Sequence, residues 1–242
     1  SSSEKTLTNY KLQYNALKEK MHEFPETEFV VWTGAAQVAG ATEPDYAWRA
    51  REFFTWVKSD WYEARDNIYI WDFYELETEG GLYLTDANAA DPYDSHPAPS
   101  FGKKVAPLFG QRLVNVIEGR GDNTSLTGNR NMKKQTISFV GLFIIAGLAF
   151  CFSYGEAKAD DSQRVLTCLG DSVTHGYPYV GTSKTYPAKL QVHLVNQYGE
   201  DQYSVVNRGV SGHRADEVLA DLQTKGWLGA DNPDAVLLMV GG

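Results

Sequence analysis

The hydrophobic and polar positions of this chain alternate between two periods along most of its length. Short apolar runs typical of buried strands occur at 29–33, 67–71, 165–169, 203–207 and 235–240. Between them, apolar residues recur three and four positions apart, as in amphipathic helices, at 7–21, 47–57, 101–116, 186–197 and 215–222. Strands and helices in alternation predict an α/β fold, with a parallel sheet covered by helices on both faces.

The strand pattern divides the chain into two segments, each of which has too few elements to form a complete domain. Residues 1–119 supply two predicted strands and residues 165–242 supply three, so we expect a sheet of about five strands. The run 235–240 is apolar throughout, which predicts a strand buried on both faces. Because neither segment alone could cover both faces of its sheet, we expect the two to form one domain.

The residues between these segments form a different kind of sequence. Met132-Lys133-Lys134 precedes an uncharged apolar run at 137–154, and Ala157-Lys158-Ala159 follows it. A basic start, an apolar run and a small-x-small site predict a secretory signal peptide over 132–159, cut after Ala159. A transmembrane helix over 137–154 and a buried core helix are the alternatives. A signal peptide would imply a secreted or periplasmic protein.

The position of this segment is unusual, because 131 residues precede Met132. A signal peptide works only at a nascent N-terminus, so the chain resembles the end of one reading frame joined to the start of another. The stretch 119–131 is polar and rich in Gly and Asn, as linkers are. We therefore expect 120–164 to be a linker outside the fold.

A candidate nucleophile follows the first strand of the C-terminal segment. Gly170-Asp171-Ser172 comes directly after the run 165–169, at a predicted strand-to-helix turn. Such turns lie at the carboxyl end of a parallel sheet, where open α/β folds place their sites. The amides of a helix start can stabilise an oxyanion. The alternative interpretation of Ser172 is a simple helix cap.

These residues resemble the SGNH (GDSL-type) hydrolases, in a circularly permuted or fused-fragment order. The first block of that family matches Gly170-Asp171-Ser172, which implies that Ser172 is the nucleophile. The second, Asn-x-x-x-x-Gly, matches 207–212, which implies that the amides of Ser172 and Gly212 form the oxyanion hole. The resemblance implies a three-layer, flavodoxin-like sheet and an esterase acting through an acyl-enzyme.

The last block of the family, Asp-x-x-His-Pro, has a near match at Tyr93-Asp94-Ser95-His96-Pro97. The match implies that His96 is the general base and that Asp94 orients it, although the spacing is two residues rather than three. Asp91 is the alternative acid, and a loop histidine is the alternative interpretation of His96. A histidine base suits a serine nucleophile near neutral pH, and a carboxylate fixes its tautomer.

The third block, Gly-x-Asn-Asp, should follow the strand at 235–240, where this sequence has Gly241-Gly242. Without the Asn, we expect an activity that is weakened or lost, because losing one oxyanion donor costs about a hundred- to a thousandfold in rate. His175, Tyr177 and His213 are candidates to line the substrate pocket. The family's chemistry implies a small-molecule ester, either an acyl lipid or an acylated carbohydrate.

The amino-acid composition argues against several other classes of function. Acidic residues outnumber basic ones by 31 to 22, and the net charge of −9 argues against general nucleic-acid binding. Two cysteines form neither a disulfide framework nor a four-cysteine metal site, and no pattern indicates a metal or organic cofactor. The competing hypotheses are a non-catalytic fused-fragment chain, held at a membrane by 137–154, and halves that pair with a second chain in a swapped dimer.

Overall fold

The computed structural model describes residues 4–64, 66–121, 125–128, 163–176 and 181–239. Five parallel strands form its main sheet, in the order β2-β1-β7-β5-β6. Their bounds are β1 Glu28–Trp32, β2 Ile68–Trp71, β5 Arg164–Gly170, β6 Tyr203–Asn207 and β7 Ala235–Met239. Counted from β5, the order is 2-1-3-4-5, the flavodoxin-like arrangement. The α/β fold class is confirmed, and both segments contribute to one sheet.

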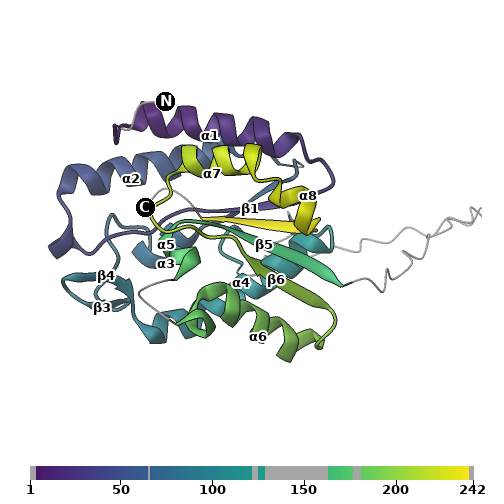
Figure 1. Ribbon diagram of the computed structural model, residues 1–242. Coiled ribbons are helices and arrows are strands. Elements are labelled where there is room, and N and C mark those ends of the chain that lie inside the picture. The colour runs from purple at the N-terminus through teal and green to yellow at the C-terminus, as the bar shows by residue number, and fades with distance from the viewer. Residues whose placement is uncertain (1–3, 65, 122–124, 129–162, 177–180, 240–242) are drawn as a thin grey trace, which may run out of the picture.

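Helices cover both faces of this sheet (Figure 1). One face carries α1 (Leu7–His22), α2 (Pro44–Trp56) and α7 (Ala215–Thr224), and the other carries α4 (Pro99–Ile117) and α6 (Tyr186–Tyr198). All five residues of β7 are buried, as expected for the central strand. Val236 and Leu238 pack into the first apolar cluster, and Leu237 and Met239 pack into the second. Alternation along a strand therefore supplies both cores.

The sequence patterns placed the long elements well and missed the short ones. The five strands and five long helices lie within three residues of their predicted ends. The missed elements are α3 (Phe73–Thr78), α8 (Trp227–Asp231), a π-turn (Val57–Trp61), two 3₁₀ turns (Ala39–Ala41, Thr182–Lys184) and a two-stranded hairpin, β3 (Ala89–Asp91) with β4 (Asp94–Pro97). The hairpin is mostly polar, so it has no apolar alternation to reveal it.

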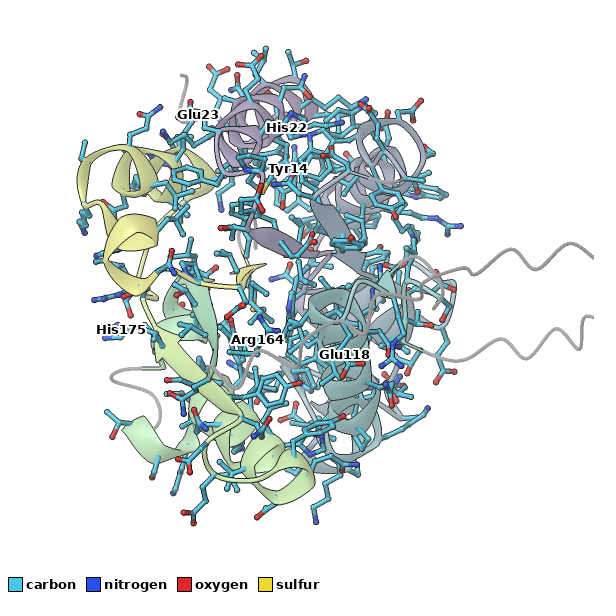
Figure 2. All side chains as sticks on the ribbon, turned by 90° about the vertical axis from the view of Figure 1, so that its right-hand side faces the viewer. Tyr14, His22, Glu23, Glu118, Arg164 and His175 are labelled. Carbon is cyan, nitrogen blue, oxygen red and sulfur yellow. The ribbon has the colours of Figure 1, made fainter. Side chains whose placement is uncertain are left out.

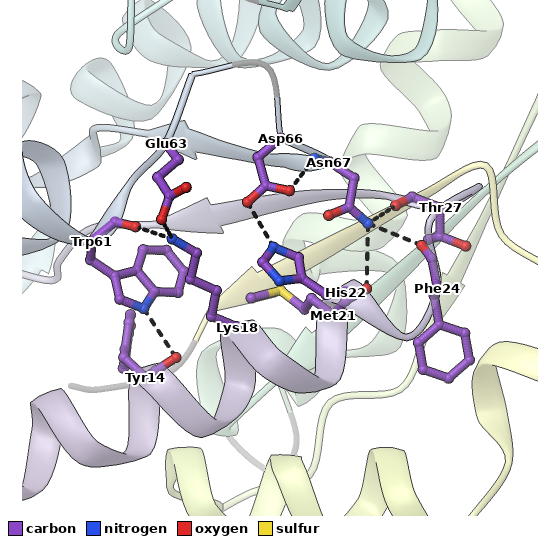
Figure 3. Close-up of polar contacts among 10 residues, drawn as sticks. All are labelled: Tyr14, Lys18, Met21, His22, Phe24, Thr27, Trp61, Glu63, Asp66 and Asn67. Atoms are coloured by element: carbon purple, nitrogen blue, oxygen red, sulfur yellow. Dashed lines mark hydrogen bonds and ion pairs between the residues drawn. The ribbon is translucent and has the colours of Figure 1, made fainter.

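The carboxyl end of α1 is fixed to the sheet by one amide side chain (Figure 3). Asn67 donates from Nδ2 to the carbonyl oxygens of Met21, Phe24 and Thr27, at 3.3, 3.0 and 3.0 Å. Carbonyls at the end of a helix lack partners within the helix, so this side chain satisfies groups that would otherwise be exposed or unpaired. The contact sets where α1 ends and β1 begins.

The structure departs from the expected linker at its two edges. Residues 125–128 pack on the domain, since Asp72 N–H donates to the carbonyl of Leu126 at 2.8 Å and Leu126 contacts the first apolar cluster. Arg164 is the first residue of β5 and not part of a linker. The predicted signal segment 132–159 and the alternative span 137–154 lie outside the described residues. No helix among the described residues is both long and apolar enough to cross a bilayer.

The two edges of that segment lie at one end of the sheet. Glu118 follows α4 and Arg164 starts β5, and both residues are labelled in Figure 2. Both affect the pKa of Tyr203 on β6. Burial raises the pKa of Tyr203, Glu118 adds to this rise, and Arg164 opposes it. The chain thus leaves the N-terminal segment and enters the C-terminal one near the amino ends of the strands, opposite the edge where the candidate nucleophile lies.

Candidate active site

Ser172 lies where the topology of the sheet reverses. β5 ends at Gly170, and the short helix α5 (Ser172–His175) begins two residues later. β6 lies on one side of β5 and β7 on the other, which makes the carboxyl end of β5 a topological switch point. Asp171 caps α5 by accepting a hydrogen bond from Val173 N–H at 2.9 Å. Burial raises the pKa of the Asp171 carboxyl, and Ser172 itself is half-buried.

Gly170 is required by the close approach of its neighbours. A Cβ at this position would lie 2.3 Å from the carbonyl oxygen of Met239 and 2.3 Å from Oγ1 of Thr174. Both distances are well below van der Waals contact, and the first involves backbone that cannot move without disturbing β7. The glycine therefore lets the chain turn sharply from β5 into α5 beside the end of β7.

The second block of the motif packs directly on this turn. Asn207 donates from Nδ2 to the carbonyl of Thr174 at 2.9 Å, and its Oδ1 accepts from Gly209 N–H at 2.9 Å. A Cβ on Gly209 would lie 2.4 Å from the backbone nitrogen of His175. Val210 N–H donates to the carbonyl of Gly170 at 2.9 Å. These contacts place the turn that leads to Gly212 against the helix that begins with Ser172.

His96 and Asp94 form a bonded pair on β4. Oδ1 of Asp94 accepts from the backbone N–H of His96 at 2.9 Å and lies 2.5 Å from its Nδ1. These two hydrogen bonds, the backbone one first, lower the pKa of Asp94. The contact assigns Nδ1 to the carboxylate and leaves Nε2 of the exposed imidazole for another partner. Asp91 instead accepts from Tyr93 N–H at 2.8 Å and closes the hairpin turn.

The histidine pair and the nucleophile come from opposite segments of the chain but lie at the same end of the sheet. In Figure 1 the β3–β4 hairpin and α5 both lie at the left-hand end, toward which the parallel strands point. Among the described residues, no hydrogen bond joins Ser172 to His96. The hairpin and α5 therefore lie at the same end of the sheet, and the Asp94–His96 contact is formed.

The residues predicted to line the substrate pocket lie in different surroundings. Nδ1 of His175 lies 3.0 Å from Oγ of Ser211, and this contact connects α5 to the turn that contains Gly212. His175 also lines a hollow of about 280 Å³ that includes Thr185, Val205 and Asn207. His213 lies 3.5 Å from Oδ2 of Asp221 on α7. Tyr177 lies outside the described residues.

Two contributors to the site were not singled out from the sequence. Asn207 is the first residue of the second block, and its side chain binds both Thr174 on α5 and Gly209 within the block. Thr174 is fully buried and its Oγ1 lies 3.4 Å from the hydroxyl of Tyr186, which connects α5 to α6. The spacing Asn-x-Gly after a strand was the available signal for Asn207. In the described ranges, no three His, Cys, Asp or Glu side chains gather as metal ligands would.

Comparison with known structures finds matches over about one third of this chain. One matched structure is described as "Crystal Structure of TesA" (29% identity over 32% of this chain and 41% of that chain, TM-score 0.29). Another is that of AlinE4, an SGNH-hydrolase family esterase (29% identity, 33% and 41% coverage, TM-score 0.30).

The similarity is confined to part of each protein, since it spans less than half the length of the matched structures. No protein-family profile matches this chain, and no curated protein matches it. The assignment of chemistry to individual residues therefore depends on their own geometry.

Proposed function

We propose that this protein hydrolyses carboxylic esters through an acyl-enzyme on Ser172, with His96 as general base and Asp94 as its orienting carboxylate. The observation that carries the proposal is the 2.5 Å contact of Asp94 with Nδ1 of His96 on the β3–β4 hairpin, which lies at the end of the main sheet where Ser172 starts a helix. The expected substrate is a small ester, either an acyl lipid or an acylated carbohydrate. The esterase description of AlinE4 agrees with this reaction class.

The reaction divides into two acyl transfers. Nε2 of His96 takes the proton of the Ser172 hydroxyl as Oγ attacks the ester carbonyl, and the Asp94 carboxylate stabilises the imidazolium that forms. The amides of Ser172 and Gly212 would donate to the oxyanion. The leaving alcohol takes the proton from His96, and water then releases the acid by the same path. Catalysis requires the hairpin to bring His96 within hydrogen-bond reach of Ser172, and substrate binding can supply that closure.

A serine-directed fluorophosphonate tests this assignment directly. The full chain is incubated with the probe, and the labelled residue is identified by peptide mass spectrometry. We expect Ser172 to be labelled, His96→Ala to slow labelling by about a thousandfold or more, and Ser59→Ala in the π-turn Val57–Trp61 to leave the rate unchanged. Folded protein that is not labelled at Ser172 would contradict the proposal.

A non-catalytic fused-fragment chain is the competing function. It predicts no probe reaction and no ester turnover, with a sheet that is nevertheless folded. Export directed by 132–159 is a separate proposal, and it is tested by expressing a frame that begins at Met132 and locating the product and its cleavage site.

A further inference from the structure

The carboxyl group of Glu77 is completely buried and has no cation beside it. Glu77 lies on α3 with a relative exposure of 0%, and its Oε2 accepts from Ala36 N–H at 2.7 Å. Its other oxygen, Oε1, is buried without a hydrogen-bond partner among the described residues. Burial raises the pKa of Glu77 to about 8, which the Ala36 N–H opposes. An isolated charge would be costly here, so burial favours the neutral form of the side chain.

The segment that Glu77 holds lies against the hairpin of His96. Two residues after Ala36, Val38 N–H donates to Oγ of Ser95 at 3.4 Å, and Ser95 stands between Asp94 and His96. A Cβ on Gly40 would lie 2.7 Å from the carbonyl oxygen of Pro92 in the hairpin turn. The segment 36–40 therefore packs on the outer part of the hairpin.

The backbone of Glu77 holds the base of the same hairpin. Its carbonyl oxygen accepts from Thr85 N–H at 3.1 Å and from Asn88 Nδ2 at 3.3 Å. Asn88 precedes β3, and its own carbonyl accepts from Ala98 N–H, which follows β4, at 2.7 Å. One residue thus contacts both the segment that covers the hairpin and the strand ends that support it.

We propose that neutral Glu77 is a positioning residue for His96: segment 34–40 and the β3–β4 hairpin open and close as one unit, and opening exposes the Glu77 carboxyl to water. This inference rests on the proposed function for its catalytic meaning, because it assigns Glu77 the task of holding the general base. Glu77 itself touches no reacting atom.

The proposal predicts a specific pH dependence of opening. In the closed state Glu77 keeps its proton to about pH 8, whereas in the open state it titrates near its ordinary value of 4.5. The open state therefore binds fewer protons between these values, and raising the pH favours opening by about tenfold per unit. The other ionisable groups nearby are Tyr74 on α3, whose pKa Glu77 helps to raise, and Asp94 and His96 on the hairpin.

Hydrogen exchange of two amides tests the coupling. Ala36 N–H reports the covering segment and Ala98 N–H reports the hairpin, and both are followed by NMR between pH 5.5 and 7.5 after correction for intrinsic exchange. In the unmodified chain we expect opening at both amides to rise by about tenfold per pH unit. In Glu77→Gln, which keeps an acceptor for Ala36 but cannot ionise, this rise disappears. Any slope due to His96 or Asp94 stays in both proteins, so the difference isolates Glu77.

Two further variants complete the experiment. Glu77→Leu removes the acceptor and should increase opening at Ala98 by about tenfold or more at pH 6, because Ala36 N–H is left unpaired. Glu75→Gln changes a neighbouring carboxylate that faces Lys58 instead, and it should keep the slope of the unmodified chain. An unchanged slope at Ala98 in Glu77→Gln, or exchange at Ala36 that responds without Ala98, overturns the proposal.

Fluorophosphonate labelling separates this inference from the proposed function. If Ser172 is labelled, we expect Glu77→Leu to lower the labelling rate while Glu77→Gln restores it toward that of the unmodified chain. If Ser172 is never labelled, the hydrolase assignment fails, and the exchange data still decide whether Glu77 couples the two segments.

Discussion

Asn207 and Thr174 are joined by a hydrogen bond of 2.9 Å, from Nδ2 of the asparagine at the end of β6 to the main-chain carbonyl in the middle of α5. The same side chain accepts from Gly209 N–H through its other atom. A helix of four residues cannot hold its own position, so contacts from outside must fix the orientation of Ser172. Asn207 supplies the contact from the second motif.

Replacing Asn207 should therefore affect both stability and the nucleophile. Asn207→Ala removes a donor and an acceptor, and we expect a loss of about 1–3 kcal/mol in the free energy of unfolding, with slower labelling of Ser172. Asn207→Asp keeps the acceptor for Gly209 N–H but places a carboxylate oxygen against the Thr174 carbonyl, so it should also lose stability. Urea unfolding measures the first effect. Equal stability of the alanine variant and the unmodified chain would contradict it.

Gly209 provides a steric test of the same junction. A Cβ there would lie 2.4 Å from the backbone nitrogen of His175 and 2.7 Å from the carbonyl carbon of Thr174. Because backbone must move to make room, Gly209→Ala should destabilise the protein by about 1–3 kcal/mol. Gly102→Ala in α4 meets no atom within 4 Å and should stabilise by about 0.5–1 kcal/mol. Thermal unfolding of the two variants gives the comparison, and shifts of the same sign would contradict the packing described.

The Asp94–His96 pair predicts a lowered titration midpoint for Asp94. Two hydrogen bonds from His96 lower the pKa of Asp94, so its ionised form is favoured in the folded state and this preference is lost as pH falls. His96→Ala removes the side-chain bond and should move the Asp94 midpoint upward, though only part of the way, because the backbone N–H remains. NMR of the carboxyl carbon measures this midpoint. A midpoint that does not move would show that the two side chains do not interact.

Arg208 and Asp231 predict an acid-sensitive contribution to stability. Arg208 donates from Nη2 and Nε to the two oxygens of Asp231, at 2.6 and 3.1 Å, and the hydrogen bond from Arg208 is the main cause of the lowered pKa of Asp231. Stability from this pair is present above the unfolded pKa of Asp231 and declines as pH falls through its folded value. Asp231→Asn should cost about 1–3 kcal/mol at pH 7 and less at lower pH. Urea titrations at pH 7 and pH 3 test this, and an equal cost at both would contradict it.

The fold class followed from local patterns because the hydrophobic periodicity of each long strand or helix is contained within its own residues. The apolar run at β7 predicted a strand buried on both faces, and all five of its residues are buried. The strand-to-helix turn after 165–169 predicted the position of Ser172, because the end of a parallel strand defines one edge of the sheet. Periodicity thus determined the elements, the layers and the end of the sheet at which Ser172 lies.

The arrangement around His96 could not be predicted in the same way. The β3–β4 hairpin is mostly polar and short, so its strands have no apolar period, and its shape depends on contacts with segments 36–40 and 84–88. Glu77 shows the same limit, because nothing near it in the sequence distinguishes it from the exposed Glu75 of the same helix. Burial is a property of what packs over a residue, so only the tertiary structure decides which carboxyl group loses its water and which histidine lies at the end of the sheet near Ser172.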